Sequence, residues 1–264
     1  MGKAIDCTND TRPYISKIKA AGVSVVIRYV GSSAWKCIAK PEADALRANH
    51  VAIASVYETT VDMMLKGKTA GVNGAKAAMA GIRAAGGPSN AFVYFACDED
   101  TSNTTAVCDY LAGAAQVLGA SRCGIYGSGA VVAAALKSGH ATKGWRSLST
   151  GWSGYGLRPR GLVLLQYGKK YGSIMPDYDA DDTLAADVGQ WNYTPPTPPA
   201  PPKPFPLGLH TLKHVAALRH HWYSILHSYS VPAGATVTVT RLFGLWALCT
   251  YNGHQGWIAI SALN

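Results

Sequence analysis

Residues 194–206 read TPPTPPAPPKPFP, and eight of these thirteen residues are proline. Proline lacks a backbone N–H and has a fixed φ, so this stretch can form neither helix nor sheet. It predicts a semi-rigid polyproline II spacer of about 40 Å, at about 3.1 Å per residue. The 264-residue chain is therefore expected to contain a large first domain, residues 1–193, a Pro-rich linker, residues 194–206, and a small second domain, residues 207–264.

Charge differs between the two domains. All fifteen Asp and Glu residues precede the linker, whereas the second domain has six of the eight histidines and three basic residues, Lys213, Arg219 and Arg241. Such a domain favours anionic ligands, more so as the pH falls into the histidine range. The alternative is that a short domain lacks acids by chance.

The net charge of +9 suits a polyanionic partner, such as an acidic cell-wall polymer, a nucleic acid or an anionic membrane. No aromatic-basic motif, recognition helix or basic amphipathic helix supports the last two, so neither nucleic-acid binding nor membrane insertion is expected. The start of the chain, MGKAIDCTNDTRPY, lacks the apolar core of a secretory signal. We therefore expect synthesis in the cytoplasm without a signal peptide, and a monomeric protein.

In the first domain, short runs rich in β-branched and aromatic residues alternate with stretches of helix formers. The predicted helices are KPEADALRAN, NGAKAAMAGIRAAGG and TTAVCDYLAGAAQVLGA. The predicted strands are KAIDCT, VSVVIRYV, VAIASVYE, AFVYFACD, RCGIYG, GWRSLSTGW and LVLLQYG, with an eighth candidate at MPDYDA. This near-eightfold alternation predicts an α/β fold, a parallel (β/α)8 TIM-type barrel. The second domain alternates apolar and polar residues around the turn signal YNGHQG, which predicts a small all-β barrel of hairpins.

Polar side chains close nearly every predicted strand of the first domain. In a (β/α) barrel the carboxyl ends of the strands meet at one mouth, where barrel active sites lie. We therefore expect a site there. Its candidate residues are Asp6, Arg28, Tyr29, Glu58, Asp98, Asp100, Tyr126, Trp152, Gln166, Asp177 and Asp179.

Three acids follow the fourth predicted strand directly: Asp98, Glu99 and Asp100. Because side chains alternate along a strand, Asp98 and Asp100 should share the inward face while Glu99 points outward. Neighbouring carboxylates raise one another's pKa, so one can stay protonated while another is ionised. Cleavage of a glycosidic bond needs such a division between a proton donor and an anion.

Two other interpretations of these acids remain open. Asp100 or Ser102 could simply cap the following helix, which begins near TSNTTAV. The D-x-D spacing, which recurs at Asp177 and Asp179, could also hold a hard metal ion with oxygen ligands, as in many glycosyltransferases. The nucleotide site that would accompany a glycosyltransferase is absent, and no metal or cofactor is expected.

The motifs of the first domain, taken in order, resemble those of a known protein family. AIDCTND, VVIRYV, IASVYE, GVNGAKAA, FVYFACDED, CGIYGSG, LLQYG and DYDAD resemble, in order and at barrel spacing, the Rv2525c-like family of glycoside-hydrolase-like domains (DUF1906). That family is similar to the GH25 lysozymes, and the resemblance covers nearly all of residues 3–190. It implies a (β/α) barrel with an acidic mouth and a carbohydrate ligand, in particular peptidoglycan.

The resemblance also bears on the catalytic residues. In GH25 enzymes the fourth strand ends in D-x-E, with the glutamate as catalytic acid. Here Asp100 stands at that position, so Asp98 and Asp100 are the expected carboxylate pair and Glu58 is a substitute candidate for the acid. Asp6 and Asp179 would tune charge and position the substrate.

The second domain resembles a bacterial SH3-like (SH3b) module through VPAGATVTVT and GLWALCTYNGHQGWIAISAL. Such modules usually bind cell-wall peptides or polymers, and Trp222 and Tyr223 are the candidate wall-binding residues. The whole is expected to be a phage endolysin-like muramidase that acts on peptidoglycan at the cell wall of the host. The main alternative is a protein that binds wall carbohydrate without cleaving it, for example a virion component.

Overall fold

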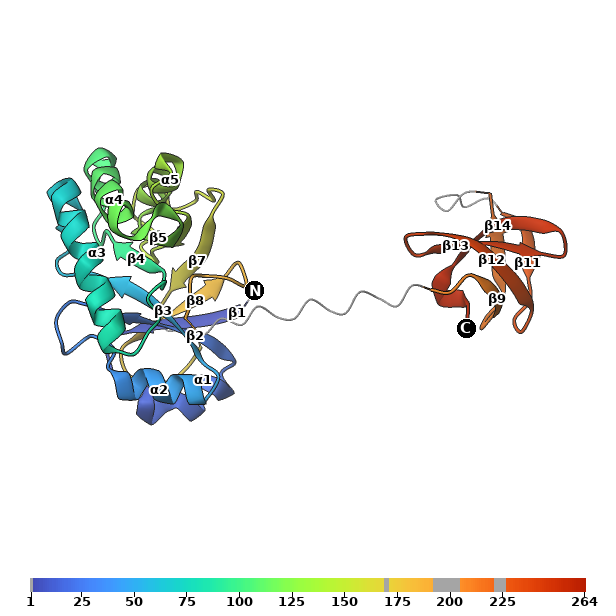
Figure 1. Ribbon diagram of the computed structural model, residues 1–264, viewed down its shortest axis with the longest axis horizontal. Coiled ribbons are helices and arrows are strands. Elements are labelled where there is room, and N and C mark those ends of the chain that lie inside the picture. Colours follow the sequence, from blue (N-terminus) through green and yellow to red (C-terminus); the bar gives the residue numbers. More distant parts are fainter. Residues whose placement is uncertain (1, 169–170, 192–204, 221–226) are drawn as a thin grey trace. The chain divides into compact units, whose positions relative to one another are not determined.

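The computed structural model describes residues 2–168, 171–191, 205–220 and 227–264, with side chains in the last range from residue 229 onward. The chain forms two compact units, Met1–Pro195 and Pro196–Asn264 (Figure 1). The division falls inside the proline-rich segment. Within the described residues, no helix is long and apolar enough to cross a bilayer.

Eight strands of the first unit close into a barrel in the order of the sequence. They are β1 (Gly2–Cys7), β2 (Val23–Tyr29), β3 (Ala52–Tyr57), β4 (Val93–Ala96), β5 (Cys123–Gly127), β6 (Lys143–Arg146), β7 (Leu162–Tyr167) and β8 (Tyr178–Thr183). The predicted TIM-type barrel is confirmed. Its last strand differs from the prediction of an all-parallel sheet, because β8 runs antiparallel to both β7 and β1. Only ten residues separate β7 from β8, too few for the helical crossover that a parallel strand requires.

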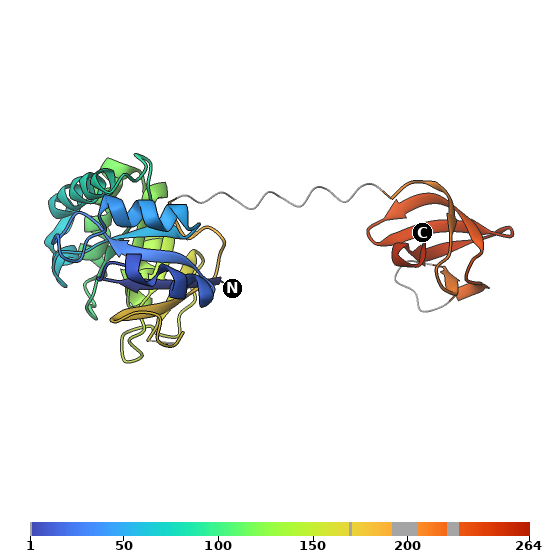
Figure 2. The same ribbon diagram turned by 90° about the horizontal axis from the view of Figure 1, so that it is seen from below.

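Five helices lie outside the ring of strands (Figures 1 and 2). They are α1 (Ile15–Ala20), α2 (Lys40–Ala48), α3 (Gly67–Ala84), α4 (Thr104–Leu118) and α5 (Gly129–Ser138), accompanied by short 3-10 turns at Arg12–Tyr14, Met63–Lys66 and Ala120–Arg122. The three predicted helices are present as α2, α3 and α4. Neither α1 nor α5 was predicted from the sequence, and α1 is too short to show an apolar period. The start of α5 carried a local signal, because the Ser128 hydroxyl accepts a hydrogen bond from the Val131 amide at 3.2 Å.

Alternate residues of the strands fill the inside of the barrel. The inner core contains Ala4, Val25, Ile27, Ala54, Val56, Phe92, Tyr94, Ala96, Tyr126, Trp145, Val163, Leu164 and Val188. The intervening residues of the same strands pack against the helices in a larger outer core. This period of two sets which side chain each strand presents at the mouth of the barrel.

The second unit is all-β, as predicted. Its strands form one six-stranded sheet in the order β11-β10-β14-β13-β12-β9. Their bounds are β9 (Gly208–Thr211), β10 (Ala216–Arg219), β11 (His227–Val231), β12 (Thr236–Phe243), β13 (Trp246–Tyr251) and β14 (His254–Ala259), followed by a 3-10 turn at Ile260–Ala262. The predicted hairpin turn lies between β13 and β14, where Asn252 and Gly253 both have positive φ.

Candidate active site

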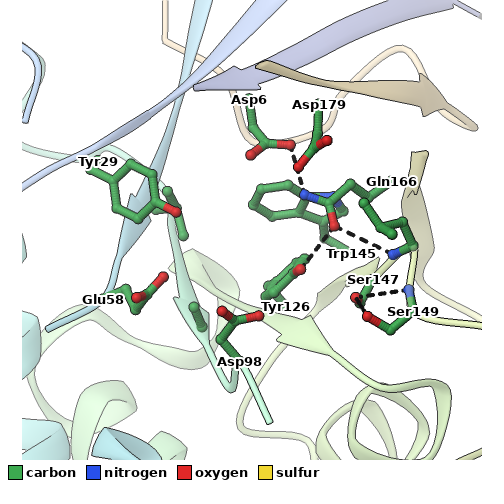
Figure 3. A pocket seen from close by; sticks show the side chains of 13 residues that line it. Asp6, Tyr29, Glu58, Asp98, Tyr126, Trp145, Ser147, Ser149, Gln166 and Asp179 are labelled. Carbon is green, nitrogen blue, oxygen red and sulfur yellow. Dashed lines mark hydrogen bonds between the residues drawn. The ribbon is translucent and has the colours of Figure 1, made fainter. Parts of the chain in front are cut away.

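A pocket of about 270 Å³ opens at the carboxyl ends of the barrel strands (Figure 3). Carboxyl, hydroxyl, amide and aromatic groups line it. The lining residues are Asp6, Tyr29, Val56, Glu58, Ala96, Asp98, Tyr126, Trp145, Ser147, Leu148, Ser149, Gln166 and Asp179. Seven of the eleven residues predicted at the mouth are therefore brought together in one pocket: Asp6, Tyr29, Glu58, Asp98, Tyr126, Gln166 and Asp179.

The alternation of the strands explains this selection. Glu58 lies two residues after the inward-facing Val56, and Asp98 lies two residues after the inward-facing Ala96. Gln166 likewise follows Leu164 on β7. Each polar residue thus continues the inner face of its strand just where the apolar core ends.

Four carboxyl groups enter the pocket as two pairs. Asp6 and Asp179 are direct partners in the β1–β8 ladder, so their side chains project on the same face. Glu58 and Asp98 come from the ends of the adjacent strands β3 and β4. In Figure 3 the two pairs lie on different sides of the pocket, and Tyr126, Trp145 and Gln166 lie on the side away from Tyr29. A polar group bound between the pairs would meet carboxyl oxygens from two directions.

Gln166 connects the Asp6 side of the pocket to its tyrosine. Its Nε2 donates to Asp6 Oδ2 at 2.9 Å, and its Oε1 accepts from the Tyr126 hydroxyl at 2.8 Å. The Leu148 amide also donates to Gln166 Oε1 at 3.3 Å. These contacts fix the orientation of the amide and hold Asp6 in place.

One buried ammonium group faces the other carboxyl pair. Lys36 lies in the loop after β2 and is 8% exposed. Its Nζ lies 3.4 Å from Glu58 Oε1 and 4.4 Å from the centroid of the Tyr29 ring. The ion pair with Glu58 and the contact with the aromatic face of Tyr29 hold the Lys36 ammonium in place.

Two pocket carboxyls bind their protons more tightly than usual. Burial, followed by the charge of Glu58, raises the pKa of Asp98, while Lys36 acts in the opposite direction. Burial, opposed by the hydrogen bond from Gln166 and reinforced by the charge of Asp179, raises the pKa of Asp6 from 3.8 to about 7. Proton donors and ionised carboxylates can therefore coexist in this pocket near neutral pH.

A further carboxyl lies beneath the pocket, inside the barrel. Asp181 is completely buried and accepts a hydrogen bond from Trp145 Nε1 at 2.7 Å. Burial, and then the charge of Asp6, raises its pKa well above the ordinary value. The indole of Trp145 also packs on the Tyr126 ring, with centroids 4.5 Å apart. Trp145 thus forms the floor of the pocket and ties it to the interior.

The expectation for Arg28 is wrong. Arg28 occupies the outward face of β2, one residue before the pocket residue Tyr29, and is 1% exposed. Its Nε and Nη2 donate to Glu42 at 2.8 and 3.1 Å, and its Nη1 donates to the carbonyls of Cys7 and Lys36. It is a structural cation that joins β1, α2 and the Lys36 loop. Because side chains alternate along β2, Tyr29 faces the pocket and Arg28 faces away from it.

Asp100 also lies outside the pocket, so the expected inward pair of Asp98 and Asp100 is not present. Strand β4 ends at Ala96, and the alternation does not extend to residue 100. The exposed Asp100 carboxylate instead accepts hydrogen bonds from the Ser153 amide at 3.0 Å and the Ser153 hydroxyl at 3.1 Å. Nor does Asp100 cap α4, whose N-cap is Asn103.

Trp152 and Asp177 are likewise not among the lining residues. Trp152 was predicted at the end of a nine-residue strand, but β6 ends at Arg146 and Trp152 belongs to the following loop. Asp177 is exposed and has a φ of 47°, in the turn before β8. The positive φ turns the chain there, so the D-x-D repeat of Asp177 and Asp179 does not deliver two side chains to one site.

Several pocket residues had no place in the sequence prediction. Trp145, Ser147 and Ser149 line the pocket but were not predicted, because the sixth strand was expected to continue to Trp152. Lys36, which pairs with Glu58, lies in a loop that has no hydrophobic periodicity to mark it. The candidate wall-binding residues Trp222 and Tyr223 lie outside the described residues. In the described part of the chain, no group of three or more His, Cys, Asp or Glu side chains is arranged to hold a metal ion.

Comparison with known proteins places this barrel in a family. Residues 16–163 match the family described as the Rv2525c-like, glycoside hydrolase-like domain. A protein of Mycobacterium tuberculosis (strain ATCC 25618 / H37Rv), Rv2525c, named as a candidate peptidoglycan hydrolase, is 30% identical over 191 residues. The match covers 67% of this chain and 78% of that protein.

Solved structures agree. The crystal structure of the Tat-secreted Mycobacterium tuberculosis protein Rv2525c, in complex with HEPES, superposes with a TM-score of 0.63 at 28% identity, covering 72% of this chain and 98% of that chain. An uncharacterized B. stearothermophilus protein shares the fold, with a TM-score of 0.54 at 15% identity over 69% of this chain and 96% of that one. The resemblance predicted from the motifs of the first domain is confirmed, and the chain belongs to the Rv2525c-like, glycoside hydrolase-like family.

Proposed function

We propose that the first unit hydrolyses glycosidic bonds in bacterial peptidoglycan, in the manner of a muramidase. The observation that carries this proposal is the arrangement of the four carboxyl groups, Asp6, Glu58, Asp98 and Asp179, as two pairs in one pocket. The name of the mycobacterial relative as a candidate peptidoglycan hydrolase supports the choice of polymer. Aromatic rings at Tyr29, Tyr126 and Trp145 suit the faces of sugar rings.

Asp98 is the proposed proton donor. Burial and the charge of Glu58 raise the pKa of Asp98, so it retains its proton to a higher pH than an ordinary aspartate does. Asp98 would protonate the glycosidic oxygen as the bond to the anomeric carbon breaks, and a water molecule would then supply the hydroxyl of the new reducing end. Asp98, rather than the substitute candidate Glu58, is therefore the proposed catalytic acid.

Asp179 and Asp6 would act on the other side of the sugar. A carboxylate there stabilises the positive charge that develops at the anomeric carbon. With an N-acetylated sugar, the substrate's own acetamido oxygen can attack that carbon, so no enzyme carboxylate needs to form a covalent bond. Gln166 holds Asp6 in the required orientation.

The second unit is proposed to be an SH3b-like wall-binding module. Residues 207–264 contain no Asp or Glu, so the unit attracts the anionic polymers of a bacterial wall. The site of action is then the cell wall. The mycobacterial relative is a Tat-secreted protein, which supports export to the wall rather than synthesis without a signal peptide.

The test is release of reducing ends from purified actinobacterial peptidoglycan, with mass spectrometry of the fragments. Wild-type protein should generate new muramic-acid reducing ends, and Asp98→Asn should lose this activity while it still sediments with the wall. A chain that ends at Pro195 should keep activity on soluble glycan but lose retention on intact walls. If the wild-type protein releases no fragment from walls that it binds, hydrolysis is excluded.

A second candidate function is carbohydrate binding without cleavage. One observation favours it: Asp100, which stands where GH25 enzymes carry their catalytic glutamate, is exposed and bonded to Ser153. Under this proposal, the wild-type protein would release no reducing ends from peptidoglycan. The Asp98→Asn variant would bind the wall as the wild type does. Saturable binding of a muramyl oligosaccharide without turnover would identify such a binding protein.

A further inference from the structure

A second pocket of the barrel unit, of about 220 Å³, lies between α3 and α4. Its lining includes Arg83, in the last turn of α3, and Arg122, directly before β5. It therefore lies at the amino-terminal ends of the strands, opposite the carboxyl pocket. The remaining lining residues are Lys76, Met79, Ser89, Val117 and Leu118. Three cations and no carboxylate face this space.

Helix packing explains why a gap exists there. A Cβ on Gly71 would lie 1.9 Å from the Tyr110 carbonyl oxygen, and a Cβ on Gly113 would lie 2.0 Å from the Lys68 carbonyl oxygen. The backbone near the start of α3 is therefore in direct contact with the middle of α4 (the pair is visible in Figure 1). Further along α3, at positions 76, 79 and 83, long side chains occupy the same face of the helix. They line the pocket together with Val117 and Leu118 at the end of α4.

Arg122 is the cation of this pocket that protein atoms hold in place. Its side chain is half-buried, with Nε donating to the Ala91 carbonyl at 3.1 Å and Nη2 donating to the Ser89 carbonyl at 2.9 Å and to Met79 Sδ at 3.3 Å. These neutral partners orient the guanidinium but do not neutralise it. A partly desolvated charge of this kind favours an anion in the adjoining space.

Lys76 and Arg83 add two further positive charges. Both side chains are exposed, and neither forms an ion pair with any residue that the structure describes. Cations near a helix end often serve only to offset the helix dipole. In α3, however, backbone amides already bond the last carbonyls: Gly86 donates to Arg83 and Gly87 to Ile82, at 2.9 and 2.8 Å.

We propose that this pocket binds a phosphate group, as a phosphomonoester or a phosphodiester. Nε and Nη2 of Arg122 already donate to protein atoms, so its Nη1 is the group that can donate to a phosphate oxygen. Lys76 and Arg83 supply the remaining charge. The pocket is larger than one phosphate, and Met79, Val117 and Leu118 provide an apolar wall for the organic part. Because it lies at the opposite end of the barrel from the carboxyl pocket, occupancy leaves that pocket open, and the proposal does not depend on hydrolysis.

The test is a titration of the full chain at constant ionic strength, followed by ¹⁵N NMR of the Arg122 side chain and the amides of residues 89–91. The probes are inorganic phosphate, glycerol 3-phosphate, dimethyl phosphate and poly(glycerol phosphate). Saturable shifts are expected at these signals, with affinity about tenfold lower in the Lys76→Gln/Arg83→Gln double variant. The matched control, Lys19→Gln/Arg160→Gln, removes two exposed charges from other elements and should change affinity less than about twofold.

The probes also distinguish the source of the ligand. Stronger binding of dimethyl phosphate and the polymer than of the monoesters would support a wall polymer, whereas the reverse order would support a small phosphorylated metabolite. Shifts that do not saturate, or an equal loss of affinity in the two double variants, would overturn the proposal, because either result means that only net charge matters.

Discussion

Asp98 and Glu58 enter one pocket from adjacent strands, each two residues beyond an inward-facing apolar residue of its own strand. This position gives Asp98 a raised pKa, first through burial and then through the charge of Glu58. Lys36, which pairs with Glu58, has the opposite influence on Asp98. The proton of the proposed catalytic acid is therefore controlled by two neighbours of opposite charge.

Substitution of these two neighbours should move the pKa of Asp98 in opposite directions. Glu58→Gln removes the repulsion that disfavours the Asp98 anion, so the pKa should fall, by about one unit for charges at this range. Lys36→Met removes a favourable cation, so the pKa should rise. Carboxyl ¹³C NMR titration of Asp98 measures both shifts without any substrate. Shifts in the same direction in both variants would contradict the electrostatic explanation.

Asp6 is expected to reduce the stability of the fold above neutral pH. Its pKa is about 7 in the folded protein against 3.8 ordinarily, so between these values the unfolded chain releases a proton that the folded chain keeps. Stability is therefore lost as the pH rises from about 4 to 7, and the full cost remains above 7. Asp6→Asn, which can still accept a hydrogen bond from Gln166, should stabilise by on the order of 2–4 kcal/mol at pH 8.

Urea unfolding of Asp6→Asn and wild-type protein at several pH values checks this prediction. The two should converge below about pH 3, where Asp6 is protonated in both folded and unfolded wild type. Asp109→Asn, on the exposed face of α4, is the matched control and should show no such divergence. A constant difference between Asp6→Asn and wild type at all pH values would instead indicate a packing effect.

The buried pair of Arg28 and Glu42 should matter for folding rather than for the pocket. Glu42 is 3% exposed and accepts from Arg28 and from the amide and hydroxyl of Thr11. Glu42→Gln leaves the Arg28 charge buried without a counter-ion, so a loss of about 3–5 kcal/mol is expected. Asp44→Asn removes an exposed carboxylate from the same helix and should have a far smaller effect. Equal losses in thermal denaturation would show that burial of this pair is unimportant.

The sequence predicted most of the barrel because most of its strands contain β-branched or aromatic residues and are followed by a turn signal. The antiparallel β8 was not predicted, since strand direction depends on whether the connection has room for a helix. At the mouth, predictions held where the period of two ran unbroken to the strand end, as at Asp6, Glu58 and Gln166. They failed at Asp100 and Trp152, which lie beyond strands that end earlier than the composition suggested.

The different positions of Asp98 and Asp100 give the sharpest test of the site. If Asp98 donates the proton, Asp98→Asn should lower the rate of reducing-end release by about 10²–10⁴-fold, which is the usual contribution of a general acid to the rate. Asp100→Asn should keep at least about a third of the activity, because its amide oxygen can still accept a hydrogen bond from Ser153 and it does not touch the pocket. The two variants change the same functional group two residues apart, so a difference between them cannot come from net charge. A greater loss in Asp100→Asn would move the acid to the position of the GH25 glutamate and require the loop that carries Asp100 to close over the substrate.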